Sequence, residues 1–156
     1  MSPQNIRIII TIVLLLHGLG HGGAIVALVV GSRGAPTGKW LAARSWLFPR
    51  LSYRLALTIA IIFWSLSLVG FVVAALWNQG FLFSEGVMQF LAPINAAIQT
   101  GVWGSIALIS AFVSFIGITL FWGTWPMFNT LAAQAVNLAV IITQLWLHWP
   151  PIAHLF

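Results

Sequence analysis

The hydrophobic positions of this chain form four long runs. They cover residues 6–31, 53–77, 100–122 and 127–149. Each run is long enough for the roughly 20 apolar residues that a helix needs to cross a bilayer. Segment 32–52 holds most of the basic residues, and segment 78–99 holds Glu85, the only carboxylate side chain. We therefore predict an all-α fold: one membrane domain over residues 1–156, built as an integral membrane four-helix bundle.

Two histidines, His17 and His21, interrupt the first apolar run one helical turn apart. An ionisable side chain at membrane depth is costly and is by default a functional hypothesis. Helical periodicity places both histidines and Gly20 on one face of the first span. The small residue predicts that another helix approaches closely on that face.

The fourth run carries a second polar feature. At about 100° per residue its polar side chains form a stripe narrower than a quarter-turn. Amides facing lipid would lack partners, so this stripe must face other helices or a wet cavity. A milder stripe on the third run includes Ser114. We predict that the histidines and the amides share one interior network. The stripe consists of Thr130, Gln134, Asn137, Gln144 and His148.

Composition supports a membrane class. The chain is 61% hydrophobic and only 4% charged, values outside the range of soluble domains. The formal net charge is +5, but the basic groups lie beside apolar runs. They therefore indicate membrane topology and contacts with lipid, with no nucleic acid as partner. The chain has no cysteine, so disulfides and thiol redox chemistry are excluded.

The basic residues also predict the orientation. Five of them flank the first connection, whereas only Arg7 lies on the opposite side. The positive-inside rule places loop 32–52 in the cytoplasm, and loop 78–99 and both termini on the outer side of a bacterial inner (plasma) membrane. Residues 86–99 are expected to form a short interfacial helix. The five basic residues are Arg33, Lys39, Arg44, Arg50 and Arg54.

The candidate site leaves several functions open. Trp64 falls near mid-membrane, where its indole N–H needs a partner. Histidine and amide donors in an apolar pocket beside Trp64 would suit the carbonyl of a bound quinone. A role as a permease subunit is a further alternative. A metal site is disfavoured because the spans offer no carboxylate or thiolate as a third ligand. The candidate cofactor-binding residues are His17, His21, Trp64, Gln134, Asn137, Gln144 and His148.

Haem b is the other cofactor alternative. The chain resembles the small cytochrome b561 proteins in its number of spans and in having histidine on the first and last of them. It departs from them in depth, because His17 lies near mid-membrane and His148 near the outer end of the fourth span. One chain therefore does not easily bracket a haem iron with these two residues.

Short motifs also resemble those of uncharacterised bacterial four-helix membrane proteins. Such proteins carry a His-Gly-x-x-His-type first span, a Ser-Trp-Leu segment after a basic loop and a Phe-Trp near the end of the third span. The resemblance implies the architecture and assigns no chemistry. The matching segments here are residues 17–21, 45–47 and 121–122.

Interhelical hydrogen bonding is the simplest role for these polar residues. We therefore favour a non-enzymatic membrane subunit or scaffold with a buried histidine–amide network and no catalytic or metal-binding residue. Its expected partners are membrane lipids and either further copies of the chain or other membrane subunits. A haem- or quinone-binding redox protein is the main alternative.

Overall fold

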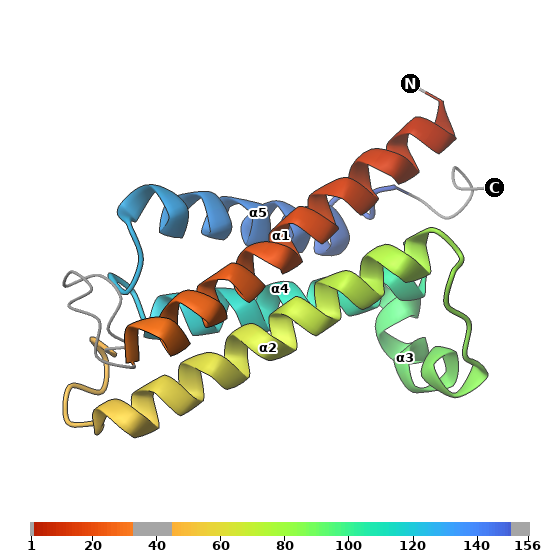
Figure 1. The fold of residues 1–156 in the computed structure, drawn as a ribbon. Helices are drawn as coiled ribbons and strands as arrows, with labels where there is room; N and C mark the ends of the chain where they lie inside the picture. The colour runs from red at the N-terminus through yellow and green to blue at the C-terminus, as the bar shows by residue number, and fades with distance from the viewer. Residues whose placement is uncertain (1, 33–44, 151–156) are drawn as a thin grey trace.

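The structure, a computed structural model, describes residues 2–32 and 45–150. These residues form five helices and no strand (Figure 1). Most of the basic connection, including Arg33, Lys39 and Arg44, lies outside the described residues. The helices are α1 (Pro3–Ser32), α2 (Tyr53–Asn78), α3 (Glu85–Ile98), α4 (Val102–Leu120) and α5 (Met127–Leu145).

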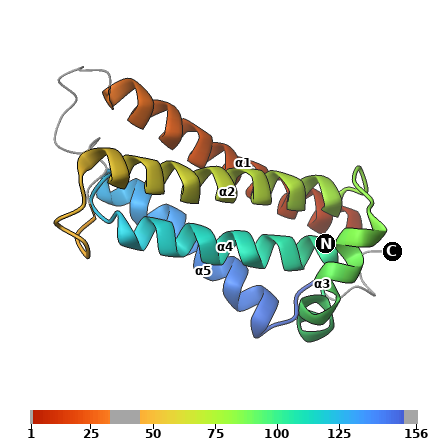
Figure 2. The ribbon, with the colours of Figure 1, turned by 90° about the horizontal axis from the view of Figure 1, so that it is seen from below.

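Four of the five helices, α1, α2, α4 and α5, are long and apolar enough to cross a membrane. This finding supports the predicted all-α class and indicates a multi-pass membrane protein. The remaining helix, α3, occupies the segment where a short interfacial helix was expected. Ser84 caps its first turn by accepting a hydrogen bond from the Val87 N–H. Helix α3 packs against α4 at one end of the bundle (Figure 2).

The long helices pack in the order α1, α2, α4, α5, whereas α1 and α5 approach each other much less closely. The beginning of α1 and the end of α5 lie at the same end of the bundle (Figure 1). α5 ends at Leu145, before the expected limit of the fourth span at Trp149. His148 takes a left-handed backbone conformation with φ 45°, and Trp149 precedes a proline, which disfavours helical geometry.

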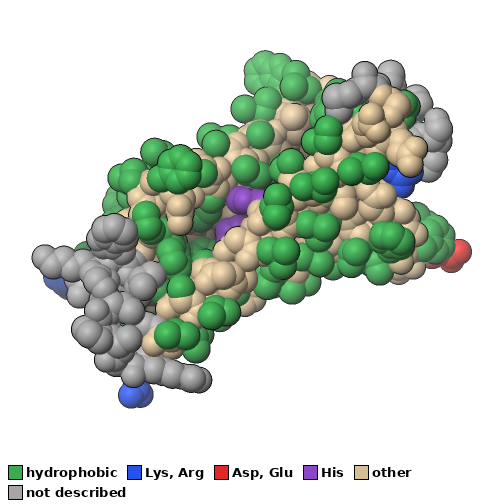
Figure 3. All heavy atoms as spheres, turned by 45° about the horizontal axis from the view of Figure 1, so that its top comes forward, with side chains coloured by type: hydrophobic (Ala, Val, Ile, Leu, Met, Phe, Trp, Pro, Cys, Tyr) green, Lys and Arg blue, Asp and Glu red, His purple; other side chains and the backbone are tan. Residues whose placement is uncertain are grey.

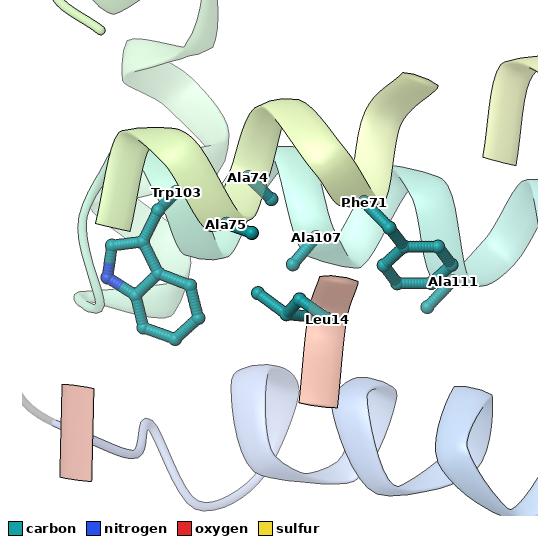
Figure 4. Packing of buried hydrophobic residues seen from close by; sticks show 7 residues of the cluster. All are labelled: Leu14, Phe71, Ala74, Ala75, Trp103, Ala107 and Ala111. Atoms are coloured by element: carbon teal, nitrogen blue, oxygen red, sulfur yellow. The ribbon is translucent and has the colours of Figure 1, made fainter. Parts of the chain in front are cut away.

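Small residues allow the central helices α2 and α4 to pack closely. A Cβ on Gly117 would lie 2.8 Å from the Cβ of Phe63, and one on Gly70 would collide with Ser110. Such close approach favours van der Waals packing between spans. One buried cluster joins α2 and α4 to Leu14 of α1; it contains Leu14, Phe71, Ala74, Ala75, Trp103, Ala107 and Ala111 (Figure 4).

The glycines of α1 do not pack as expected. Gly18 faces α2, where an added Cβ would lie 3.2 Å from the Phe71 Cβ. Gly20 has nothing within 4 Å of an added Cβ among the described residues, so no helix in the described part of the chain makes the predicted close approach at Gly20. The reason is geometric: Gly18 and Gly20 differ by about 200° around the helix, so only one of them can face α2.

A polar clamp ties the beginning of α1 to the end of α2. The Arg7 guanidinium donates to the backbone carbonyl of Asn78 at 2.5 and 3.1 Å. Asn78 returns a hydrogen bond to the Arg7 carbonyl at 3.1 Å and one to Thr11 at 3.0 Å. A cation at a helix C-terminus also complements the helix dipole. The clamp fixes how far α1 is displaced along α2.

Candidate functional site

His17 and His21 lie where α1 passes over α4 and α5. The rings pack edge to face, with centroids 5.0 Å apart. Both contact Phe71 of α2, at centroid distances of 4.7 Å for His17 and 6.3 Å for His21. His21 is only 6% exposed. The pair is therefore held between α2 on one side and polar groups of α4 and α5 on the other.

Each histidine makes a hydrogen bond to a different helix. His17 Nε2 lies 2.9 Å from Asn137 Oδ1 on α5. His21 Nε2 lies 2.9 Å from Ser114 Oγ on α4. Asn137 links the two contacts because its Nδ2 donates to Ser114 Oγ at 2.8 Å. Three spans are thus joined through four side chains.

The network continues along α5 to Gln134. Asn137 Nδ2 also donates to Gln134 Oε1 at 3.0 Å. The Gln134 amide in turn donates to Thr119 Oγ1 at 3.0 Å and to the Phe115 carbonyl at 3.2 Å. Asn137 is fully buried, and a buried amide of this kind is costly unless it is hydrogen-bonded. We call His17, His21, Ser114, Gln134 and Asn137 the mid-span network.

The contacts define the direction of one hydrogen bond and constrain another. An amide oxygen only accepts, so His17 donates its Nε2–H to Asn137. Ser114 Oγ accepts from Asn137 Nδ2 and keeps one hydroxyl proton that it can donate to His21 Nε2. This arrangement predicts that His17 carries its proton on Nε2 and His21 on Nδ1.

A hollow exposes part of this site to the outside of the bundle. Figure 3 shows the histidines between ridges of hydrophobic side chains on α1 and α5. The hollow follows from the wide spacing between these two helices. Gly20 lies on the exposed surface of α1 one residue before His21 and adds no side chain there.

The other predicted site residues lie elsewhere. Gln144 accepts a hydrogen bond from Thr100 and donates to the Trp149 carbonyl at 3.1 Å. His148 lies beyond the end of α5, and its Nδ1 is 3.1 Å from the Ile98 carbonyl. We call Thr100, Gln144 and His148 the end network. None of these hydrogen bonds links the end network to the mid-span network.

Trp64 also lies apart from the histidines. It is 1% exposed and packs beside Phe121 and Trp125, with ring centroids 6.4 and 5.8 Å away. This second buried cluster also contains Leu28 of α1. Trp64 is seven residues from Phe71, or about 10 Å along α2. The candidate cofactor set therefore divides into three places in the fold.

Sequence reasoning gave too little weight to Ser114. It belonged to a mild stripe on the third span, yet it contacts both His21 and Asn137. Helical spacing shows which polar residues share a face, but not which helix that face meets. Within residues 2–32 and 45–150, no three histidine or acidic side chains are grouped closely enough to hold a metal ion.

Comparison of the chain with protein-family models, with curated proteins and with solved structures finds no match. The function of this protein is therefore inferred from its own residues and their geometry.

Proposed function

We propose that this protein is a non-enzymatic integral membrane subunit that assembles with further copies of itself or with other membrane subunits. In this role, the mid-span network holds α1 against α4 and α5. The observation that carries the proposal is that the Nε2 atoms of His17 and His21 bond to different helices. A group that joins three spans through side chains of one chain is suited to fixing helix positions.

The same contacts favour this role over haem ligation. Coordination of an iron through Nε2 would require the hydrogen bond to Asn137 or Ser114 to break. Phe71 also lies against both rings. The purified protein is expected to show no Soret absorption band. A Soret band that is lost in His17→Ala would overturn the proposal in favour of a redox protein.

Assembly is supported by the open surface of α1. Within the described part of the chain, added Cβ atoms on Gly20 and Gly23 would meet nothing within 4 Å, so α1 has two small residues on an open surface. Small residues let a helix from another protein or another copy pack closely. Leu16 and Leu19 beside them are 66% and 60% exposed, which leaves apolar surface for the same partner.

The assembly test is the variant Gly20→Leu, which fills the open surface without a clash inside the chain. Native mass spectrometry and in-membrane crosslinking should show an oligomer or complex that is weakened in this variant. Ala132→Leu is the matched control, because Ala132 is exposed on α5. A wild-type protein that is monomeric by both methods would contradict the proposal, and so would equal weakening by the control.

We also propose that the 32–52 connection faces the cytoplasm and both termini face outward in a bacterial inner membrane. Arg50 lies in this connection and Arg54 follows it closely, whereas Arg7 lies at the opposite end of the helix bundle, beside Asn78. The chain contains no cysteine, so single-cysteine variants report cleanly. In spheroplasts, a membrane-impermeant maleimide should label Phe83→Cys and should label Leu47→Cys only after permeabilisation. The reverse pattern would show the opposite orientation.

A further inference from the structure

Cationic and aromatic side chains share the surface of the molecule where α2 begins. Arg50 and Arg54 are both exposed. Trp46 and Phe48 are 60% and 53% exposed, and Tyr53, the first residue of α2, is exposed as well. We call these five residues the basic surface. It combines positive charge with apolar area, which is the combination that a phospholipid presents in complementary form.

The segment that carries the basic surface is tied to the bundle. Trp46 Nε1 donates to the backbone carbonyl of Thr119 in the last turn of α4 at 2.5 Å. Ser45 Oγ accepts from the Phe48 N–H at 3.2 Å, and the Leu51 N–H donates to the Phe48 carbonyl at 3.1 Å. Leu51 also packs against the second buried cluster. The basic surface therefore has a defined place beside the end of α4 and the beginning of α2.

The chain supplies no carboxylate side chain that could neutralise this charge. Its only one, Glu85, is the first residue of α3. Arg54 lies in the first turn of α2, and α3 follows the far end of that helix (Figure 1). Arg54 and Asn78 are separated by about 36 Å of helix, which is several times the screening length of about 8 Å at physiological salt. The counter-charge must therefore come from another molecule.

The position of the basic surface indicates which molecule that is. Helix α2 is one of the four helices that are long and apolar enough to span a membrane, so its first turn marks one edge of the hydrocarbon layer. Tryptophan and tyrosine concentrate at that edge. Arginine is suited to phosphate groups because its planar guanidinium can donate two parallel hydrogen bonds. The phosphates of the membrane lipids lie at this depth.

We propose that the basic surface binds anionic glycerophospholipids, with the lipid phosphate at Arg50 and Arg54 and the glycerol and upper acyl carbons against Trp46 and Phe48. A headgroup such as glycerol leaves the lipid with a net negative charge, whereas choline adds a positive charge that this surface repels. The surface therefore selects lipids by charge. This lipid site depends neither on the histidine contacts nor on assembly through α1, and it holds for either orientation of the chain.

The test uses the full chain in detergent, delipidated and then titrated separately with palmitoyl-oleoyl phosphatidylglycerol and palmitoyl-oleoyl phosphatidylcholine. Native mass spectrometry should show tighter binding of phosphatidylglycerol, and the preference should shrink as the ammonium acetate concentration rises. Arg54→Gln should weaken phosphatidylglycerol about fivefold, the equivalent of about 1 kcal/mol per basic residue, and should leave phosphatidylcholine unchanged. Arg54→Lys keeps the charge and should retain the preference.

Two further variants separate the parts of the site. Phe48→Ser removes apolar area without changing charge, so it should weaken both lipids to the same degree. Arg7→Gln is the matched control, because it removes the same charge at the opposite end of the bundle. The preference for phosphatidylglycerol should survive in this control.

Three results would overturn the proposal. The first is equal affinity of the wild-type protein for the two lipids. The second is loss of the preference in Arg7→Gln to the same extent as in Arg54→Gln. The third is displacement of phosphatidylglycerol by soluble glycerol phosphate, which would identify a site for free phosphate instead of a lipid. None of these results would alter the outcome of the Soret or crosslinking experiments on the proposed function.

Discussion

The two polar networks of this protein use similar residues for different purposes. The mid-span network joins side chains to side chains across α1, α4 and α5. The end network largely joins side chains to backbone carbonyls, as in the contact of Gln144 with Trp149 and that of His148 with Ile98. The first positions whole spans against one another. The second ties down the chain where helices stop and carbonyls lose their partners.

The difference follows from where α5 ends. Asn137 lies in the interior of α5, so its backbone groups are satisfied and its amide can reach other helices. Gln144 lies in the last turn, and the carbonyl of Trp149 lies beyond the helix. A residue's place along the helix therefore decides its role, although both residues belong to one stripe in the sequence.

The largest expected effect is that of Asn137→Leu. The substitution keeps the approximate size of the side chain and removes its contacts with His17, Ser114 and Gln134. Three contacts at about 0.6 kcal/mol each predict a total loss of about 2 kcal/mol of stability. Reversible unfolding in mixed detergent micelles measures this loss. Leu138→Ala, at an exposed neighbouring site, is the control and should cost much less. Equal losses in the two variants would show that the network contributes little.

Gly104→Ala tests the end network alone. An added Cβ would collide with the Thr100 hydroxyl and the Gln144 amide. Overpacking of this kind is expected to cost about 1–2 kcal/mol. Hydrogen exchange should rise at the Trp149 amide, because the Gln144 contact that orders this segment is disturbed. The exchange of α1 should stay unchanged, and a rise there would show that the two networks are coupled.

A double-mutant cycle measures the separation of the networks directly. His17→Leu and Asn137→Leu should show a coupling energy of about 0.6 kcal/mol and at most about 1.7 kcal/mol. His17→Leu and Gln144→Leu share no partner, so their effects should add within about 0.5 kcal/mol. Strong coupling in the second pair would mean that the end network also holds α1.

The smallest expected effect is a spectroscopic one: His17 and His21 should differ in tautomer. This difference is measured from the ¹⁵N chemical shifts of the two imidazole rings. His17 should carry its proton on Nε2 and His21 on Nδ1. In Ser114→Ala the shifts of His21 should change more than those of His17, since only His21 contacts that hydroxyl directly. Identical tautomers in the wild-type protein would contradict the assigned direction of the hydrogen bonds.

Much of the fold was predictable because lipid imposes a simple rule. A backbone that crosses hydrocarbon must satisfy its own hydrogen bonds, so long apolar runs become helices. The helical stripe on residues 127–149 also placed Gln134 and Asn137 on the face that meets the histidines. The close packing of α1 was less predictable. Gly18 and Gly20 are both small residues in the same span, and the sequence does not show that only Gly18 faces α2.

By itself, the sequence determined the four apolar helices and the presence of polar groups that must find partners inside the bundle. The tertiary structure decided which partners they find. Ser114 joins His21 to Asn137. The end of the bundle is held by Gln144 and His148, and Trp64 packs in a separate cluster. The physical reason is that periodicity fixes directions around one helix axis. The rotation and displacement of each helix against its neighbours depend on packing between residues far apart in the chain.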